Sequence, residues 1–258
     1  MIRKFNQNGF VILQSVNFKH IKNDIKKNIR ITLEEILRKK KIKIKKVKSF
    51  DKFLTEIYKK DISKNHKIFK SLYEIAPSLP GIFGLSTSKV FIKIAKQLGL
   101  KFPVVGTGST LRIDRPNDIN RITSIHQDQW YSFLSSNAIT IWFNLSKIKN
   151  EDGPIKIYKK SHKYGIFKFK NINMGTYKAS LKKKDKFEIE KIFLKENQIL
   201  IFNQKLLHES SKNKSKDKPR LSAQIRFNDL KNLSDLTSSF KFVSSEFVQK
   251  KQNQNLLR

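Results

Sequence analysis

The sequence predicts a mainly β fold preceded by helices, with the strands arranged as an antiparallel sandwich or barrel. Apolar residues recur at helical spacing in the first hundred residues. After Gly99, short segments rich in Ile and Phe alternate with turn-like clusters of Asn, Asp, Gly and Lys. No repeat or flexible linker divides the chain. We therefore expect one domain over residues 1–258, largely helical over 1–100, with a β-core over 101–230 and a frayed tail over 247–258.

The helical half opens with a short strand, 9-GFVIL-13. An apolar residue then recurs every fourth position, which predicts an amphipathic helix: Ile21, Ile25, Ile29, Leu33 and Leu37. A second helical stretch, 50–76, is expected to break near Asp61 and to end at 77-PSLPG-81. A third begins after Ser86 or Thr87 as N-cap and stops at Gly99.

The second half contains seven short apolar segments that predict strands. These are residues 103–113, 122–128, 138–145, 154–158, 187–194, 198–203 and 219–227. Residues 168–186 are polar with one central glycine. This stretch is expected to form a long loop that could act as a lid.

Composition restricts the class of protein. The 258 residues include 55 Lys+Arg and 21 Asp+Glu, for a net charge of +34, but nine Arg leave 55 − 9 = 46 Lys. A Lys-, Ile- and Asn-rich chain is typical of an AT-rich genome, so we expect a solvated basic surface without a specific nucleic-acid or membrane partner. No apolar run reaches the length of a membrane helix, no signal peptide is evident, and a cytoplasmic protein is expected.

Cysteine is absent, which excludes disulfides, thiolate zinc sites and a cysteine nucleophile. Any metal must be held by His and carboxylate. In 124-SIHQDQW-130, alternation along an extended segment points His126 and Asp128 to one face and Gln127 to the other. One imidazole and one carboxylate make two thirds of the 2-His-1-carboxylate set that holds non-haem Fe(II).

A third ligand is offered by His208, which follows the apolar run in 200-LIFNQKLLHESS-211. A lone His beside such a run is also typical of a satisfied core residue. Twelve residues later, 219-PRLSAQIRF-227 alternates and places Arg220, Ser222, Gln224 and Arg226 on one face. An Arg that faces a β-core needs an anionic partner, which a dicarboxylate cosubstrate would supply. An edge strand with a wet polar face is the alternative.

These blocks resemble the phytanoyl-CoA dioxygenase family of Fe(II)/2-oxoglutarate dioxygenases over residues 5–228. The matching segments are His126-Gln127-Asp128, 139-ITIWFNL-145, 150-NEDGPIKIYKKSHK-163 and 198-QILIFNQKLLHESS-211 followed by 219-PRLSAQIRF-227. The turn before Ser161-His162 usually carries Pro-Gly and here is Lys159-Lys160. The resemblance implies a double-stranded β-helix, the jelly-roll of cupin-like proteins.

The resemblance further implies Fe(II) held by His126, Asp128 and His208. It places 2-oxoglutarate on Arg220, with Ser222 or Ser210 nearby and Trp142 lining the pocket. Arg112 and Gln127 are expected to contact substrate, although Arg112 could instead pair with Asp114. Arg226 is expected some 20 Å along the strand from Arg220 and uninvolved with the cosubstrate. With O₂, such an enzyme hydroxylates a C–H bond of a small anionic or carbohydrate-linked metabolite and releases succinate and CO₂.

Three alternatives remain at this stage. A nucleic-acid oxidative demethylase shares the iron motif, and Arg220 and Arg226 match its R-x5-R spacing. A non-enzymatic, basic cupin-like binding protein would not turn over 2-oxoglutarate. A halogenase on the same fold would need a small residue in place of Asp128. The sequence does not indicate the oligomeric state.

Overall fold

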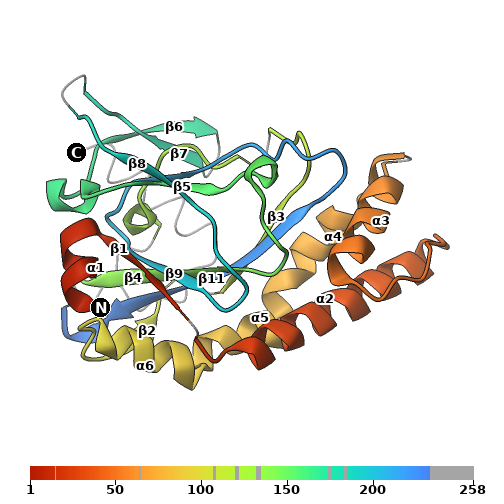
Figure 1. Ribbon diagram of the computed structural model, residues 1–258, viewed down its shortest axis with the longest axis horizontal. Coiled ribbons are helices and arrows are strands. Elements are labelled where there is room, and N and C mark those ends of the chain that lie inside the picture. Colours follow the sequence, from red (N-terminus) through yellow and green to blue (C-terminus); the bar gives the residue numbers. More distant parts are fainter. Residues whose placement is uncertain are drawn as a thin grey trace.

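The computed structural model describes residues 1–14, 16–63, 65–106, 109–119, 122–131, 135–173, 176–182 and 185–232. The predicted tail, 247–258, lies outside this part of the chain. Within it, the α-helices precede the β-core apart from the strand β1 (Figure 1). They are α1 (Ile2–Asn8), α2 (Lys19–Lys39), α3 (Phe50–Ser63), α4 (Ile68–Ile75), α5 (Pro80–Phe83) and α6 (Lys89–Gln97).

The strands form two main sheets and a hairpin, and every named pair is antiparallel. The large sheet has the order β1 (Phe10–Leu13), β9 (Ile199–Asn203), β4 (Ala138–Asn144), β11 (Arg220–Asp229) and β2 (Pro103–Val105), and β3 (Thr110–Asp114) also pairs with β11. The small sheet has the order β10 (His208–Ser210), β5 (Ile155–Tyr158) and β8 (Ile189–Ile192). β6 (Phe169–Asn173) and β7 (Thr176–Ala179) form the hairpin. The fold is thus the predicted cupin-like arrangement, although the strand pairs of the described residues do not close into a barrel.

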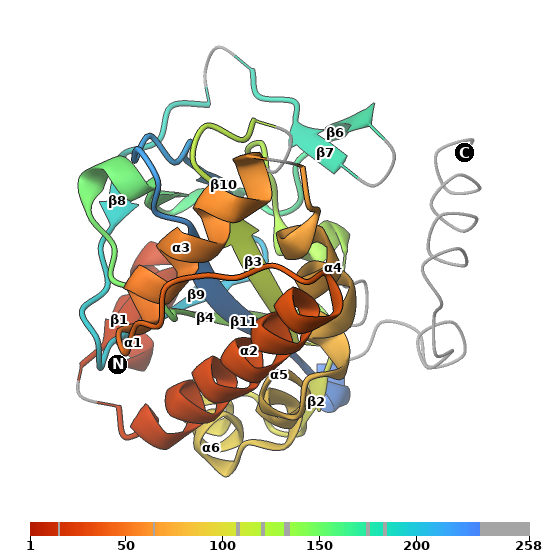
Figure 2. The same cartoon turned by 90° about the vertical axis from the view of Figure 1, so that its right-hand side faces the viewer.

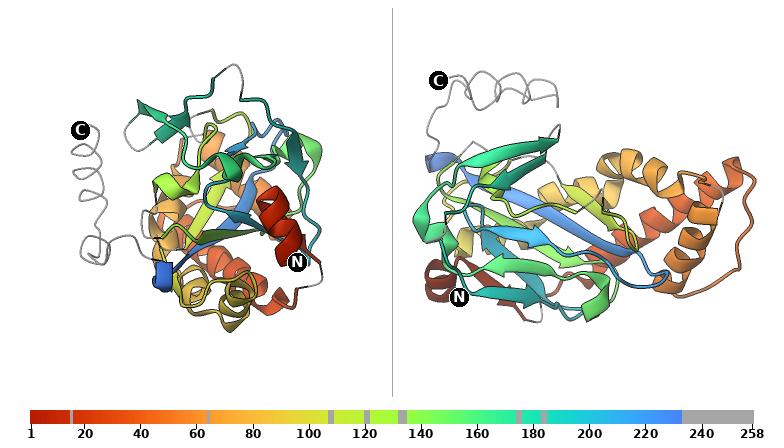
Figure 3. Two further views of the ribbon diagram at one scale, coloured as in Figure 1. Left: turned by 90° about the vertical axis from the view of Figure 1, so that its left-hand side faces the viewer. Right: turned by 90° about the horizontal axis from the view of Figure 1, so that it is seen from above.

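Helices cover one face of the large sheet, and the small sheet lies over the other (Figures 1 and 3). The predicted stripe of α2 is almost entirely buried, and the helix lies beside α4 and α5 (Figure 2). Gly81 of α5 approaches α2 so closely that an added Cβ would lie 2.9 Å from the Ile25 Cα atom. The Gly81 amide donates to the Asn28 side chain at 2.7 Å. This contact ties the two helices together.

Strand alternation separates the two faces of the large sheet. Along β4, Ile139, Ile141 and Phe143 join the core shared with the helices. The alternate residue Trp142 packs instead with β5 and β9 between the sheets. In β11, Leu221 and its alternate neighbours face the helices. The opposite face, which carries Arg220 and Arg226, is therefore directed between the sheets, as the sequence predicted.

Some local expectations were wrong. Residues 122–128 do not form a strand, because only His126 makes a β-bridge there. The expected loop 168–186 contains the β6–β7 hairpin, whose tip at 174–175 is outside the described residues. Pro80 begins a short helix, since proline is tolerated in a first helical turn.

The Lys159-Lys160 turn retains a glycine-like backbone. Lys160 has φ 62°, in the left-handed region, and its amide donates to the Asn8 carbonyl at 3.0 Å. The turn leads to His162, whose Nε2 lies 3.1 Å from the Asn6 carbonyl oxygen. An added Cβ at Gly9 would lie 2.4 Å from Nδ1 of His162. The contacts of His162 are therefore with the start of the chain.

No single helix among the described residues is both long and apolar enough to span a bilayer. One bent pair, 68–78 with 80–97, reaches that length and composition only when its two members are counted together.

Candidate metal centre

The sequence-predicted ligands His126, Asp128 and His208 come together between the sheets. The two histidines form an antiparallel β-bridge, with each amide donating to the other carbonyl at 2.9 and 3.0 Å. Asp128 begins a 3₁₀ turn, Asp128–Trp130, which bends its carboxylate back beside the histidines. One potential ligand atom from each residue lies within 4.8 Å of the others, and all three residues are buried.

Both imidazole rings direct their Nε2 atoms toward the Asp128 carboxylate. Nδ1 of His126 lies 2.8 Å from the Ser124 carbonyl oxygen, and Nδ1 of His208 lies 3.0 Å from that of Leu206. A carbonyl only accepts, so both Nδ1 atoms carry a proton, and Nε2 is the ring atom that each histidine directs toward Asp128. These Nε2 atoms lie 3.7 and 3.8 Å from Oδ1 of Asp128. Burial, followed by the nearby His126, lowers the pKa of His208 to about 3, so this ring is neutral at pH 7.

Asp128 is fully buried, and both of its oxygens accept hydrogen bonds. The Thr140 hydroxyl donates to Oδ2 at 2.6 Å, and Nη2 of Arg226 donates to Oδ1 at 2.8 Å. Burial alone would raise the pKa of this carboxyl, but Arg226 and the adjacent histidines outweigh it and hold the pKa well below its ordinary value. The carboxylate is thus ionised and fixed in place.

Arg226 has a contact that the sequence did not indicate. It was expected to take no part in cosubstrate binding, and its contact is with Asp128, a predicted metal ligand. Thr140 was also missed. The register of β11 against β4 places Arg226 opposite Thr140, and both side chains reach the same carboxylate. In the sequence, these positions were marked only by the two-residue alternation of β4 and β11, which places them on the face opposite the helix-facing residues.

Arg220 lies in a buried cluster with Asp114 and Arg112. Its Nε and Nη2 donate to Oδ2 of Asp114 at 3.2 and 2.6 Å, and its Nη1 donates to the Gly153 carbonyl. Nη2 of Arg112 donates to Oδ1 of Asp114 at 3.2 Å and to the Ser210 hydroxyl at 3.3 Å. The sequence predicted that Arg220 needs an anionic partner but did not identify Asp114 as one.

The cluster keeps one excess positive charge, because two guanidinium groups share one carboxylate. Burial raises the pKa of Asp114, but Arg220 and Arg112 reverse this effect and hold it below the usual value. Arg220 is 2% exposed. Three of its five N–H groups donate to acceptors among the described residues, which leaves two that a further acceptor could use.

Ser222 and Asn144 face each other across β11 and β4, next to this cluster in the strand register. Both are buried, and the Ser222 Oγ and Asn144 Oδ1 atoms lack a hydrogen-bond partner among the described residues. Buried polar atoms without a partner are uncommon, and a bound ligand or water is one way to satisfy them. Trp142, two residues before Asn144, is 2% exposed and packs between the sheets. Asn144 was not singled out from the sequence.

Gln127 points away from the ligands and is fully buried. Its amide nitrogen donates to the carbonyls of Gly165 and Lys205, and its oxygen accepts from the Phe167 amide at 2.9 Å. These bonds tie three segments together. The hydrogen bonds of Gln127 are thus with the backbone of neighbouring segments, and its predicted substrate contact stays a prediction.

Aromatic side chains adjoin the metal ligands on the side of the β6–β7 hairpin. The Tyr131 ring lies 5.9 Å from that of His126 and 5.6 Å from that of Tyr177. Phe169 lies 4.9 Å from both Tyr177 and the buried Trp130. Burial raises the pKa of Tyr131 to about 12, so its phenol remains protonated at pH 7.

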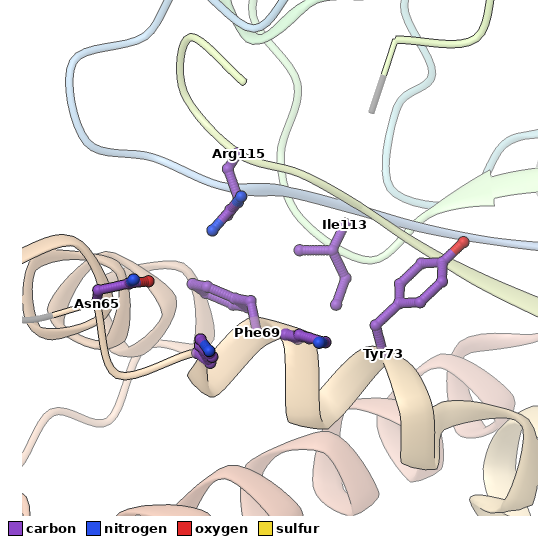
Figure 4. A pocket seen from close by; sticks show the side chains of 7 residues that line it. Asn65, Phe69, Tyr73, Ile113 and Arg115 are labelled. Atoms are coloured by element: carbon purple, nitrogen blue, oxygen red, sulfur yellow. The ribbon is translucent and has the colours of Figure 1, made fainter. Parts of the chain in front are cut away.

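A separate cavity of about 220 Å³ lies between α4 and β3 (Figure 4). Phe69 and Tyr73 of α4 line it together with Ile113 and Arg115. Ile113 belongs to the helix-facing core, so this cavity opens on the opposite face of β3 from Arg112 and Asp114. None of the three metal-ligand candidates lines it.

Comparison with solved structures identifies the same fold in several other proteins. EctD from S. alaskensis, solved with 2-oxoglutarate and 5-hydroxyectoine, matches with a TM-score of 0.59 and 14% identity over 90% of this chain and 76% of EctD. The α-ketoglutarate-dependent epimerase SnoN from nogalamycin biosynthesis matches with a TM-score of 0.55 and 14% identity, over 88% and 81%. EvdO2 from Micromonospora carbonacea var. aurantiaca gives 0.53 and 12%, over 92% of both chains. At these identities the likeness is one of fold.

No curated protein matches the chain. The family model for phytanoyl-CoA dioxygenase (PhyH) matches residues 5–222, which is most of the sequence and includes the three predicted ligands. The chain therefore belongs to the phytanoyl-CoA dioxygenase family of iron- and 2-oxoglutarate-dependent oxygenases.

Proposed function

We propose that the protein hydroxylates an unactivated C–H bond of a small anionic or carbohydrate-linked metabolite, using Fe(II), 2-oxoglutarate and O₂ and releasing succinate and CO₂. The observation that carries this proposal is the convergence of His126, Asp128 and His208, buried and with their donor atoms within 4.8 Å of one another. Two imidazoles and one carboxylate are the donor set of non-haem Fe(II) oxygenases.

The donor atoms suit a divalent metal. The Nε2 atoms of His126 and His208 both face Oδ1 of Asp128, at 3.7 and 3.8 Å, so two imidazole nitrogens and a carboxylate oxygen point at one place. The carbonyls of Ser124 and Leu206 fix the tautomers, as partners of ligating histidines commonly do. We assign His126, Asp128 and His208 as the iron ligands.

We assign the arginine cluster as the site of the distal 2-oxoglutarate carboxylate. Arg220 has two N–H groups to donate, and Asp114 holds its guanidinium plane in place. The excess charge of the cluster favours an anion. Ser210, Ser222 and Trp142 complete the predicted site, and Asn144 is added because its orphaned Oδ1 faces Ser222 across the strands.

The bound metal and cosubstrate would supply the oxidising chemistry. The protein positions and encloses the reactants. Arg220 would orient the cosubstrate, and Asp128 is immobilised by Thr140 and Arg226. The aromatic side chains Tyr131 and Tyr177 limit the access of water from the hairpin side, and burial keeps His208 neutral as a ligand must be.

The substrate is assigned only by class. Arg112 is 23% exposed and reaches both Asp114 and Ser210, so it can contribute to either cosubstrate or an anionic substrate. EctD is described with a small hydroxylated metabolite, and SnoN as an epimerase, so this fold supports different outcomes on small molecules. We also propose a single domain, because helices and strands share one hydrophobic core.

The proposal is tested by substrate-dependent succinate release across a panel of anionic and carbohydrate-linked metabolites. His126→Ala and His208→Ala should each abolish turnover and most Fe(II) affinity while circular dichroism stays unchanged. His162→Ala is the matched control, since its ring contacts the N-terminal segment instead. Normal iron-dependent turnover by His208→Ala would refute the ligand assignment. A wild-type protein that never consumes 2-oxoglutarate would favour the binding-protein alternative.

A further inference from the structure

Three side chains meet in the proposed metal centre, and a permanent cation contacts the carboxylate among them. Oδ1 of Asp128 lies 3.7 and 3.8 Å from the Nε2 atoms of His126 and His208. Of the described side chains, only Arg226 brings a permanent positive charge within ion-pair distance of this carboxylate, at 2.8 Å. The Arg226 side chain is itself only 12% exposed, so solvent screens the pair weakly.

One oxygen atom of Asp128, Oδ1, would serve both the metal and Arg226. Oδ1 is the Asp128 atom nearest to both histidines, and it also accepts the Arg226 hydrogen bond. The other oxygen, Oδ2, is occupied by the neutral hydroxyl of Thr140. A metal bound at Oδ1 would therefore lie close to a guanidinium group of the same sign of charge.

We infer that Arg226 is a built-in counter-ion that stabilises the metal-free centre and is in electrostatic competition with the metal. This inference rests on the metal site assigned under the proposed function. Without metal, the guanidinium of Arg226 compensates the buried carboxylate of Asp128, which it contacts at 2.8 Å. With metal bound, the dication takes over this role, and Arg226 then repels it. One residue thus favours a folded, empty centre and weakens metal binding.

This role is distinct from simple positioning of Asp128. A residue that only orients a ligand weakens metal binding when it is removed. A competing counter-ion does the reverse: its removal destabilises the metal-free protein and tightens metal binding. Arg226→Met separates the two, because Met retains much of the apolar stem and removes the charge.

The experiment measures Ni(II) affinity by calorimetry at pH 7.5 and Tm with and without Ni(II), a redox-stable probe of the same donor set. For Arg226→Met we expect a metal-free Tm roughly 5 °C or more below wild type. We expect much of that loss to be recovered with Ni(II), and Ni(II) to bind at least tenfold more tightly. Weaker Ni(II) binding, or an equal loss of Tm with and without metal, would overturn the inference.

Three further variants keep the result interpretable. Thr140→Val removes the other hydrogen bond to Asp128 without a change of charge, and it should not tighten Ni(II) binding. Arg226→Lys keeps the charge and should resemble wild type in metal-free Tm more closely than Arg226→Met does. In an Asp128→Asn background the carboxylate charge is gone, so adding Arg226→Met should no longer lower Tm. If it lowers Tm as much as in wild type, Arg226 is not the counter-ion of Asp128.

The two proposals fail differently. A wild-type protein that binds neither Ni(II) nor Fe(II) would refute the metal centre itself. A wild type that binds Ni(II), combined with an Arg226→Met variant that binds it more weakly, would refute only the counter-ion role.

Discussion

Arg112 reaches the Ser210 hydroxyl, with Nη2 3.3 Å from Oγ, and so connects the arginine cluster to the strand that carries His208. Ser210 lies two residues after His208, on the same side of β10. The candidate cosubstrate site and the candidate metal site are therefore neighbours. A short molecule with a carboxylate at each end could contact both.

Arg220→Leu should weaken 2-oxoglutarate binding by roughly a hundredfold, because breaking a buried charge pair costs on the order of 3–5 kcal/mol. Ni(II) affinity should change little, since Arg220 is not a ligand. The measurement is the KM for 2-oxoglutarate in succinate formation, with Ni(II) binding followed separately. Arg30→Leu, on the outer helix α2, is the control and should leave this KM unchanged. An unaltered KM in Arg220→Leu would show that another residue binds the distal carboxylate of 2-oxoglutarate.

Ser222→Ala should separate stability from cosubstrate binding. The buried Ser222 hydroxyl has no hydrogen-bond partner in the part of the chain that the structure describes, so its removal should leave the free energy of unfolding unchanged or slightly higher. The KM for 2-oxoglutarate should rise about tenfold if the hydroxyl donates to a carboxylate. Ser135→Ala is the reverse control, because its hydroxyl bonds to Asn137. It should destabilise by about 1 kcal/mol and leave KM unchanged. A destabilised Ser222→Ala with normal KM would contradict the assignment.

Lys22→Met should stabilise the protein at pH 7. Lys22 is 5% exposed, and burial, with help from Lys26, lowers its pKa to about 8. The folded state therefore releases this proton before the unfolded state does, so the charged form opposes folding below pH 8. Removing it should add on the order of 1–3 kcal/mol at pH 7, less the loss of the 2.8 Å bond to the Glu196 carbonyl. The gain should fade between about pH 8 and 10.5 in denaturant titrations. Lys27→Met, exposed on the same helix, should show no such pH dependence.

Duplex DNA should bind weakly and without sequence preference, since the positive charge resides mainly in dispersed lysines. Binding measured by fluorescence anisotropy should fall steeply between about 50 and 200 mM salt. Oligonucleotides carrying alkylated bases should not stimulate succinate formation. Tight, sequence-dependent binding at physiological salt, or such stimulation, would favour the nucleic-acid demethylase alternative.

The sequence was informative wherever a pattern repeats along one element. The four-residue stripe of α2 and the two-residue alternation of β11 both report which side of an element is apolar, and both agree with the structure. The two histidines and Asp128 were found because their residue types are chemically distinctive. The glycine-like Lys160 was visible only as a departure from the family pattern.

What the sequence did not indicate depends on register between distant strands. Asp114 meets Arg220 because β3 pairs with β11 at those positions, and no local pattern records that pairing. Arg226 meets Asp128 because a 3₁₀ turn bends the carboxylate back toward β11. The sequence predicts a loop where the β6–β7 hairpin lies, because the residues there are mostly polar. The aromatic residues of the hairpin pack against Trp130 and Tyr131.

The backbone bridge between His126 and His208 sets the spacing of these two ligands independently of the long chain segment between them. Insertions or deletions within that segment can alter neighbouring surfaces while the two imidazoles stay paired. A one-residue slip of the bridge, by contrast, would turn both out of place together. The two candidate ligands are therefore kept or lost as a pair, and changes of length are best tolerated in the loops between the core strands of the intervening segment.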